Sequence, residues 1–205
     1  MIDFLIAGII LGLSAGVAPG PLLTLVISET IQHNIKAGVK VALAPLVTDL
    51  PIVLLTFFII SKLSSFNLIL GIISLCGALF LLYMGYENIR TKNINTDFEN
   101  VTSRSLTKGI IANTLSPHPY LFWLSVGSPM IIRAMKINTY SVISFISGFY
   151  IFLLGSKIVI AILVGRSKTF LNDKIYLYTI RFLGSILWIF AIVLFYDGIK
   201  LFGII

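Results

Sequence analysis

The sequence predicts an all-α membrane protein whose six transmembrane helices form two inverted three-helix repeats, with helices 1 and 4 broken by prolines. Three observations carry this prediction. The composition is far more apolar than that of a soluble domain, six apolar runs are long enough to cross a bilayer, and the first and fourth runs each contain a closely spaced pair of prolines.

The composition favours a chain that lies almost entirely in the membrane. Only 11% of the 205 residues are charged and 58% are hydrophobic, whereas a soluble domain carries about 25% charged residues. Little sequence remains outside the apolar runs, so we expect a lipid bilayer around the chain and no soluble domain. The net charge of +7 comes largely from basic residues near the ends of those runs, and we therefore expect no nucleic-acid partner.

Six runs reach the roughly 20 apolar residues that span a bilayer. They are Phe4–Thr30, Val39–Ile60, Phe66–Tyr86, Leu106–Ile132, Tyr140–Gly165 and Tyr176–Phe202. We divide the chain into a first three-span repeat (1–90), a cytoplasmic linker (91–107) and a second three-span repeat (108–205), which together make one integral membrane domain.

The basic residues predict the orientation, because cytoplasmic loops carry an excess of Lys and Arg. Most of them follow the first, third and fifth runs: Lys36, Lys40, Arg90, Lys92, Arg104, Lys108, Arg166, Lys168 and Lys174. We therefore expect a multi-pass protein of the cell (cytoplasmic) membrane with both termini outside the cytoplasm.

Each repeat contains one proline-bracketed break, with Pro19 and Pro21 in the first run and Pro117 and Pro119 in the fourth. A proline inside a helix removes one N–H donor and displaces the carbonyl four residues earlier. In hydrocarbon each orphaned group costs several kcal/mol unless protein, water or ligand satisfies it. Broken helices at matching places in two halves of a membrane chain indicate the central site of a secondary transporter.

Short sequence matches support the repeat. Ala18–Leu23 aligns with Ser116–Leu121, and Tyr86–Arg90 is similar to Tyr196–Lys200. Because three is an odd number of spans, the second copy must enter the membrane upside down relative to the first. This geometry places a site near the midplane, between the two breaks.

Asp49 lies near the middle of the second run. A charge at the bilayer centre costs roughly 2.5–3.5 kcal/mol on insertion scales, so a functional role is the default hypothesis. Asp49 could bind and release a coupling proton, or it could face a substrate ammonium group. A salt bridge or hydrogen bond that merely joins helices is the structural alternative.

Lys157 is interpreted as the only other full charge deep within a run. It could pair with Asp49, oppose a substrate carboxylate, or extend its long stem towards the cytoplasmic surface. His118, between the prolines of the second break, could relay protons or line a wet cavity. His33, at the cytoplasmic edge of the first run, is expected to be solvated.

No metal site and no cofactor are predicted. Asp49 and His118 make a weak metal site without further ligands. Because Cys76 is the single cysteine, neither an intramolecular disulfide nor a Cys-rich metal cluster can form. The sequence shows no nucleophile–base set of an enzyme.

The free helix ends around the breaks predict the substrate site. Half-helix N-termini after Pro21 and Pro119 suit a carboxylate, and freed carbonyls before each break suit an ammonium group or a cation. These ends describe a zwitterion site, although a sugar or a drug could also use them. The predicted substrate-binding residues are Ser14, Pro19, Gly20, Pro21, Asp49, Asn113, Ser116, Pro117, His118 and Pro119, and the predicted coupling residues are Asp49 and Lys157.

Gly8, Gly12 and Gly16 recur every four residues in the first run. Such a stripe of small residues lets another helix approach closely. It could pack within the monomer or form the seam of a homodimer.

Four motifs point to one family. They are a Gly- and Pro-containing stretch in the first run (Gly12–Pro21), a glycine and an acid in the second (Gly38 and Asp49), the end of the third (Gly77 and Tyr83–Tyr86), and the pair Lys108-Gly109 before the second break. Over essentially the whole chain they resemble the lysine exporter (LysE/RhtB) family of amino-acid efflux proteins.

Two positions depart from the pattern of that family. Ser116-Pro117-His118 stands where the family typically has Asn-Pro-Lys, and Ala44 and Pro45 interrupt the usual glycine pattern before Asp49. The resemblance implies export of amino acids or related small metabolites, driven by a proton or sodium gradient. The alternatives are a metal or inorganic-ion exporter and a non-transporting membrane accessory subunit.

Overall fold

A computed structural model describes residues 2–59, 66–90, 102–167 and 173–201, and every regular element within these ranges is helical. In chain order the elements are α1 (Ile2–Val17), α2 (Pro21–Gln32), α3 (Ile35–Ala42), α4 (Ala44–Ile59), α5 (Phe66–Arg90), α6 (Thr102–Thr114), α7 (Pro117–Phe122), the π-helical turn η2 (Trp123–Gly127), α8 (Ser128–Met135), α9 (Thr139–Ser167) and α10 (Asp173–Leu201). Most of the predicted linker, residues 91–101, lies outside the described residues.

Four stretches of the described chain are long and apolar enough to cross a membrane: Ile35–Leu54, Gly71–Arg90, Thr139–Ser167 and Leu177–Leu201. Helices α1 and α2 make a fifth if they count as one span, with a bend of 61° between them. The predicted fourth run is divided among α6, α7, η2 and α8, none of which has the length to cross a bilayer alone.

Both interruptions follow from local chemistry. Pro21 is the first residue of α2 and Pro117 the first of α7. Proline suits this position because its missing N–H would have no partner inside the helix and its φ angle is already helical. The preceding residues, Gly20 and Ser116, have extended backbones, so the chain changes direction at these two points.

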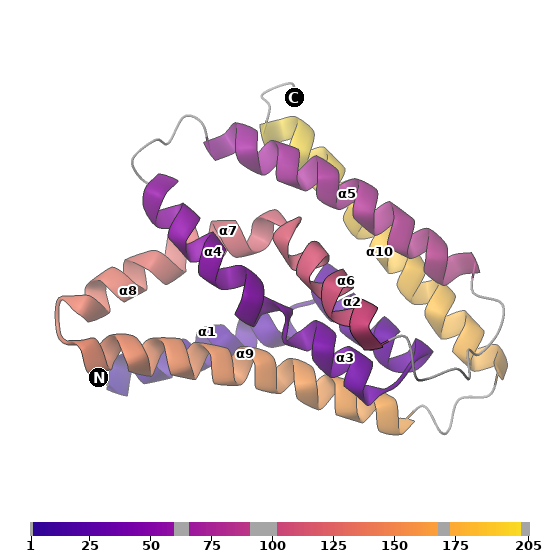
Figure 1. Cartoon of the computed structure of the whole chain (residues 1–205), viewed down its shortest axis with the longest axis horizontal. Coiled ribbons are helices and arrows are strands. Elements are labelled where there is room, and N and C mark those ends of the chain that lie inside the picture. The colour runs from indigo at the N-terminus through magenta and orange to yellow at the C-terminus, as the bar shows by residue number, and fades with distance from the viewer. Residues whose placement is uncertain (1, 60–65, 91–101, 168–172, 202–205) are drawn as a thin grey trace.

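Two helix pairs flank the molecule (Figure 1). Helix α5 lies against α10, and α1 lies against α9, with α2, α3 and α6 between the two pairs. The pair α5–α10 is antiparallel, because Gly85 meets Gly184 while Gly71 meets Gly198. The pair α1–α9 is parallel. Residue numbers rise together along the two helices, because the successive glycines of α1 (Gly8, Gly12 and Gly16) meet Phe145, Phe149 and Ser156 of α9.

The glycine stripe of α1 packs against α9 of the same chain. A Cβ atom on Gly8 or Gly12 would collide with the backbone at Phe145 or Phe149, and one on Gly16 with the side chain of Ser156. The stripe is therefore the contact that lets α9 approach α1 closely. It is not free to form the seam of a homodimer.

Large apolar side chains cover the outer faces of the long helices. Ile10 of α1, Leu79 of α5, Ile151 of α9 and Ile189 of α10 are all more than half exposed, at 57%, 66%, 65% and 60%. Extended apolar surface of this kind marks a membrane or partner contact. Since it occurs on α5, α9 and α10, which carry candidate membrane spans, and on α1, the first part of a candidate broken span, we assign these faces to the lipid-facing surface.

Candidate functional site

A cavity with a volume of about 220 Å³ lies where the two chain interruptions meet. Residues from both interruptions and from α4, α9 and α10 contribute to its wall. The lining residues are Ala15, Ala18, Pro19, Gly20, Pro21, Leu22, Leu23, Pro45, Asp49, Ala112, Asn113, Ser116, His118, Pro119, Phe122, Trp123, Phe149, Leu153, Lys157 and Phe190.

Most residues predicted for the site line this one cavity: Pro19, Gly20, Pro21, Asp49, Asn113, Ser116, His118, Pro119 and Lys157. Two predicted residues do not. Ser14 is exposed on α1, and Pro117 is buried at the start of α7. The structure thus brings together groups that are up to 138 residues apart, from Pro19 to Lys157, while their role in substrate binding stays a prediction.

Asp49 is buried, with 4% of its surface exposed, and joins several elements through hydrogen bonds. Its Oδ1 accepts from Nδ2 of Asn113 on α6 at 3.2 Å and from Oγ1 of Thr48 at 3.5 Å. Its Oδ2 accepts from the Tyr150 hydroxyl on α9 at 3.2 Å, and the Trp123 side chain also forms a hydrogen bond with this carboxyl group. Neutral donors therefore satisfy a carboxyl group whose burial is otherwise costly.

Lys157 is equally buried, at 3% exposure, but its ammonium group binds backbone. Its Nζ donates to the carbonyl of Ala15 at 3.2 Å and to that of Gly16 at 2.9 Å. Ala15 lies four residues before Pro19, so its carbonyl is one that the proline leaves without a helical partner. A cation at this helix end also complements the negative end of the helix dipole.

Two of the three interpretations of Lys157 are therefore wrong. Its side chain does not extend to the surface, because the ammonium group is held at the end of α1. Within the described residues Lys157 binds these two carbonyls and forms no ion pair with Asp49. Facing a substrate carboxylate is the interpretation that remains open, since an ammonium group has three N–H donors and only two are used here.

His118 lies exposed at the rim of the cavity. Its Nδ1 is 3.1 Å from the hydroxyl oxygen of Ser116. The imidazole thus belongs to the wall of the second interruption, as predicted, and its role there is untested.

Sequence reasoning missed an aromatic wall of the cavity. The rings of Phe122 and Phe149 are stacked with centroids 5.0 Å apart, and Trp123 meets Phe149 edge to face at 5.5 Å. Tyr150 continues this group and binds Asp49. The only available signals were the closeness of Trp123 to the second break and a phenol within an apolar run, and aromatic residues are too common in membrane spans for either to stand out.

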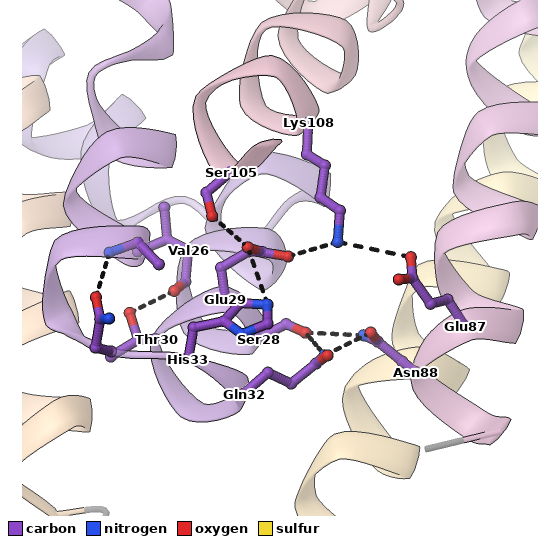
Figure 2. Close-up of polar contacts among 12 residues, drawn as sticks. Val26, Ser28, Glu29, Thr30, Gln32, His33, Glu87, Asn88, Ser105 and Lys108 are labelled. Carbon is purple, nitrogen blue, oxygen red and sulfur yellow. Dashed lines mark hydrogen bonds and ion pairs between the residues drawn. The ribbon is translucent and has the colours of Figure 1, made fainter. Parts of the chain in front are cut away.

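Figure 2 shows a second polar group, which we name the Glu29 cluster. The cluster comprises Glu29, His33, Glu87, Ser105 and Lys108, from α2, the residue that follows α2, α5 and α6. None of its residues lines the cavity. One sequence interpretation is wrong here: His33 is not solvated, because it is 8% exposed and lies 3.6 Å from Glu29. Glu29, near the end of the first predicted run, is a further buried charge, with 1% of its surface exposed.

The described residues contain no group of three or more His, Cys, Asp or Glu side chains that could hold a metal ion. The polar side chains in the cavity wall include the carboxyl group of Asp49, the ammonium group of Lys157, the amide of Asn113, the hydroxyl of Ser116 and the imidazole of His118. Aliphatic, aromatic and proline side chains form much of the remaining wall. Such a site suits a small molecule that carries both charges.

Comparison with known families supports a transport role. The family model of the LysE type translocator matches residues 13–198. The chain belongs to the LysE type translocator family. No curated protein and no solved structure matches it.

Membership in the LysE type translocator family confirms the resemblance noted in the sequence. Together with the apolar helices, it makes the protein a multi-pass membrane transporter of the exporter kind. Its partners are accordingly a small-molecule substrate and membrane lipids.

Proposed function

We propose that this LysE type translocator exports amino acids or related small zwitterionic metabolites across the cytoplasmic membrane, coupled to a proton gradient or, alternatively, a sodium gradient. One observation carries the proposal. Asp49 and Lys157 line the same cavity but each binds neutral groups instead of the other. Asp49 then faces the substrate ammonium group, and the free donor of Lys157 faces the substrate carboxylate.

The proposed architecture is six spans in two inverted three-span repeats, residues 1–90 and 108–205, joined by the linker 91–107. The fourth span is the stretch from α6 to α8, a broken span like α1–α2. The helix directions support this arrangement, because three spans per inverted repeat require the first and fifth spans to be parallel and the third and sixth to be antiparallel. Pairs α1–α9 and α5–α10 have these directions. Both termini then lie outside the cytoplasm.

Transport proceeds by rocking one repeat against the other around a site near the midplane. The proposed substrate-binding residues are the predicted ones that line the cavity: Pro19, Gly20, Pro21, Asp49, Asn113, Ser116, His118 and Pro119. Ser14 and Pro117, which the sequence also predicts, lie outside the lining. Asp49 carries the coupling proton or contacts the substrate amine, Lys157 is the second coupling residue, and His118 adjusts the polarity of the site.

Gradient-driven flux in proteoliposomes tests the proposal, using a panel of labelled amino acids with the native protein and Asp49→Asn side by side. We expect flux of one class of amino acid that responds to a pH jump and collapses in the folded variant. The matched control is Asp3→Asn, since Asp3 is an exposed carboxyl group in the first turn of α1 and its loss should leave flux unchanged.

The outcomes separate the two roles of Asp49. Loss of the pH response alone assigns it to coupling, whereas loss of binding assigns it to the substrate amine. Absence of flux for every amino acid with well-folded native protein contradicts the proposed substrate class.

A further inference from the structure

The Glu29 cluster connects helices that belong to different halves of the chain (Figure 2). Nζ of Lys108 on α6 lies 2.9 Å from Oε1 of Glu29 on α2 and 3.6 Å from Oε2 of Glu87 on α5. Oε2 of Glu29 also accepts from the Ser105 hydroxyl at 2.6 Å. Residues 1–90 thus contribute the two acids, and α6 contributes the cation and the hydroxyl.

A group of uncharged polar side chains, Ser28, Gln32 and Asn88, lies beside the charged residues of the cluster and joins α2 to α5. Nδ2 of Asn88 donates to the Ser28 hydroxyl at 2.9 Å. Nε2 of Gln32 lies 2.7 Å from both the Asn88 carbonyl oxygen and the Ser28 hydroxyl. These contacts stay within the first half, whereas the contacts of Glu29 with Lys108 and Ser105 join this assembly to α6.

The cluster lies between the cavity and one end of the molecule. Glu29 follows the cavity residue Pro21 by eight positions on α2, which is about 12 Å along a helix. Lys108 precedes the cavity residue Ala112 by four positions on α6. The end of α2, the end of α5 and the start of α6 meet here, and the proposed topology places all three on the cytoplasmic side.

Exposure decreases along the cluster towards its interior. The side chain of Glu87 is 44% exposed, that of Lys108 is 19% exposed and that of Glu29 is 1% exposed. Water therefore reaches the α5 side of the cluster and is excluded from Glu29. Among these three charged members of the cluster, Glu29 is thus the one most shielded from solvent.

A buried ion pair such as that between Glu29 and Lys108 favours two discrete states, one with the charges paired and one with them separated. A buried ion pair adds little net stability compared with apolar packing, and its best-attested use is to define a particular arrangement. Partial separation is costly because each charge loses its partner before water can replace it. Interfaces that repack salt bridges therefore move between a paired state and a fully hydrated one.

We propose that the Glu29 cluster is the cytoplasmic gate of the transport pathway, closed in this structure by the ion pair between Glu29 and Lys108. Substrate reaches the cavity from the cytoplasm only when α6 moves away from α2 and α5 and both charges become hydrated. This inference goes beyond the proposed substrate class and rests on the alternating access of the two repeats.

Thiol accessibility tests the gate without any transported substrate. Cys76 is exposed and is replaced by Ser, and Ala112→Cys places a reporter in the cavity wall. A membrane-impermeant cationic methanethiosulfonate is then applied to the cytoplasmic face of inside-out vesicles. We expect Lys108→Met and Glu29→Gln each to raise the labelling rate at least about tenfold, because weakening the closed state increases the open population.

Two controls isolate the ion pair. Lys108→Arg preserves the charge and should keep labelling slow, and Lys36→Met removes an exposed lysine of the neighbouring helix α3 and should have no effect. The Glu29→Gln side chain keeps its size and can still accept from Ser105, so this variant carries the test if Lys108→Met does not fold.

A purely structural ion pair predicts a different result. The folded variants would then melt at a lower temperature but label at the parental rate, which would overturn the proposal, as would faster labelling only from the opposite face. Since the assay needs no amino acid, a protein that exports no amino acid can still pass or fail it. Failure of the gate and failure of the proposed substrate class are thus separate results.

Discussion

The cavity and the Glu29 cluster each contain a buried acid and a base, but they arrange the two charges in opposite ways. In the cluster, Lys108 lies 2.9 Å from Glu29. In the cavity, Asp49 is satisfied by neutral side-chain donors and Lys157 by the carbonyls at the end of α1. Buried charges that pair hold helices together, whereas buried charges satisfied by neutral groups retain electrostatic attraction for a ligand.

The largest effect should come from breaking the paired charges. Glu29→Ala leaves the Lys108 ammonium group without its closest anion, and we expect the free energy of unfolding to fall by about 3–5 kcal/mol, as for other broken buried pairs. Reversible unfolding in mixed micelles measures this. The control Glu87→Ala removes an exposed acid 3.6 Å from the same ammonium group and should cost less than about 1 kcal/mol. Equal losses would contradict the burial assigned to Glu29.

Removing the base of the cavity should cost less stability and more function. Lys157→Met takes a charged donor from the carbonyls of Ala15 and Gly16, for which we expect a loss of about 1–3 kcal/mol. In the same proteoliposomes, preference for an amino acid over its decarboxylated amine should vanish, because the proposed carboxylate contact is gone. Lys200→Met, at an exposed lysine in the last turn of α10, is the control. Retained preference would remove Lys157 from the site.

A smaller change should follow from removing one of the groups that donate a hydrogen bond to Asp49. Tyr150→Phe deletes the hydroxyl that lies 3.2 Å from the carboxyl group, and a hydrogen bond of this kind contributes about 1 kcal/mol, or roughly a fivefold change in an equilibrium constant. We expect KM for the substrate and the pH dependence of flux to change while the protein stays folded. Tyr140→Phe, at a tyrosine that is 72% exposed, should behave like the native protein.

The smallest effect on flux is expected from a substitution at Ser14, a predicted site residue that does not line the cavity. Ser14 is exposed on α1 and outside the lining, so Ser14→Ala should change flux by less than about twofold, within the range of ordinary surface substitutions. The paired variant Ser116→Ala changes a buried lining residue and should reduce flux more. The reverse order would show that the substrate contacts α1 outside this cavity.

Much of the candidate site could be predicted because its signals are local. Pro19 and Pro21, only two residues apart, interrupt a helix through local backbone geometry, and a lone acid such as Asp49 in an apolar run has to find polar partners. The sequence could not predict that the Lys157 ammonium group binds the carbonyl that Pro19 frees, because 142 residues separate Lys157 from Ala15. That contact exists only because the glycines of α1 let α9 approach.

The same limit explains the wrong interpretation of His33 and the burial of Glu29, which no sequence pattern indicated. Both residues stand near the end of the first run, where a solvated position is the ordinary expectation. They are buried because α6 returns to this point and supplies Ser105 and Lys108. No pattern within the first run carries information about which residues of α6 will face it.

By itself the sequence determined the apolar helices, the two interruptions and the membrane environment, because helix periodicity, proline geometry and the cost of burying charge act over a few residues. Tertiary structure alone decided which charges pair. Asp49 and Lys157 share a cavity without touching, and Glu29 binds Lys108. These outcomes depend on how distant helices pack, and packing is a property of the whole chain.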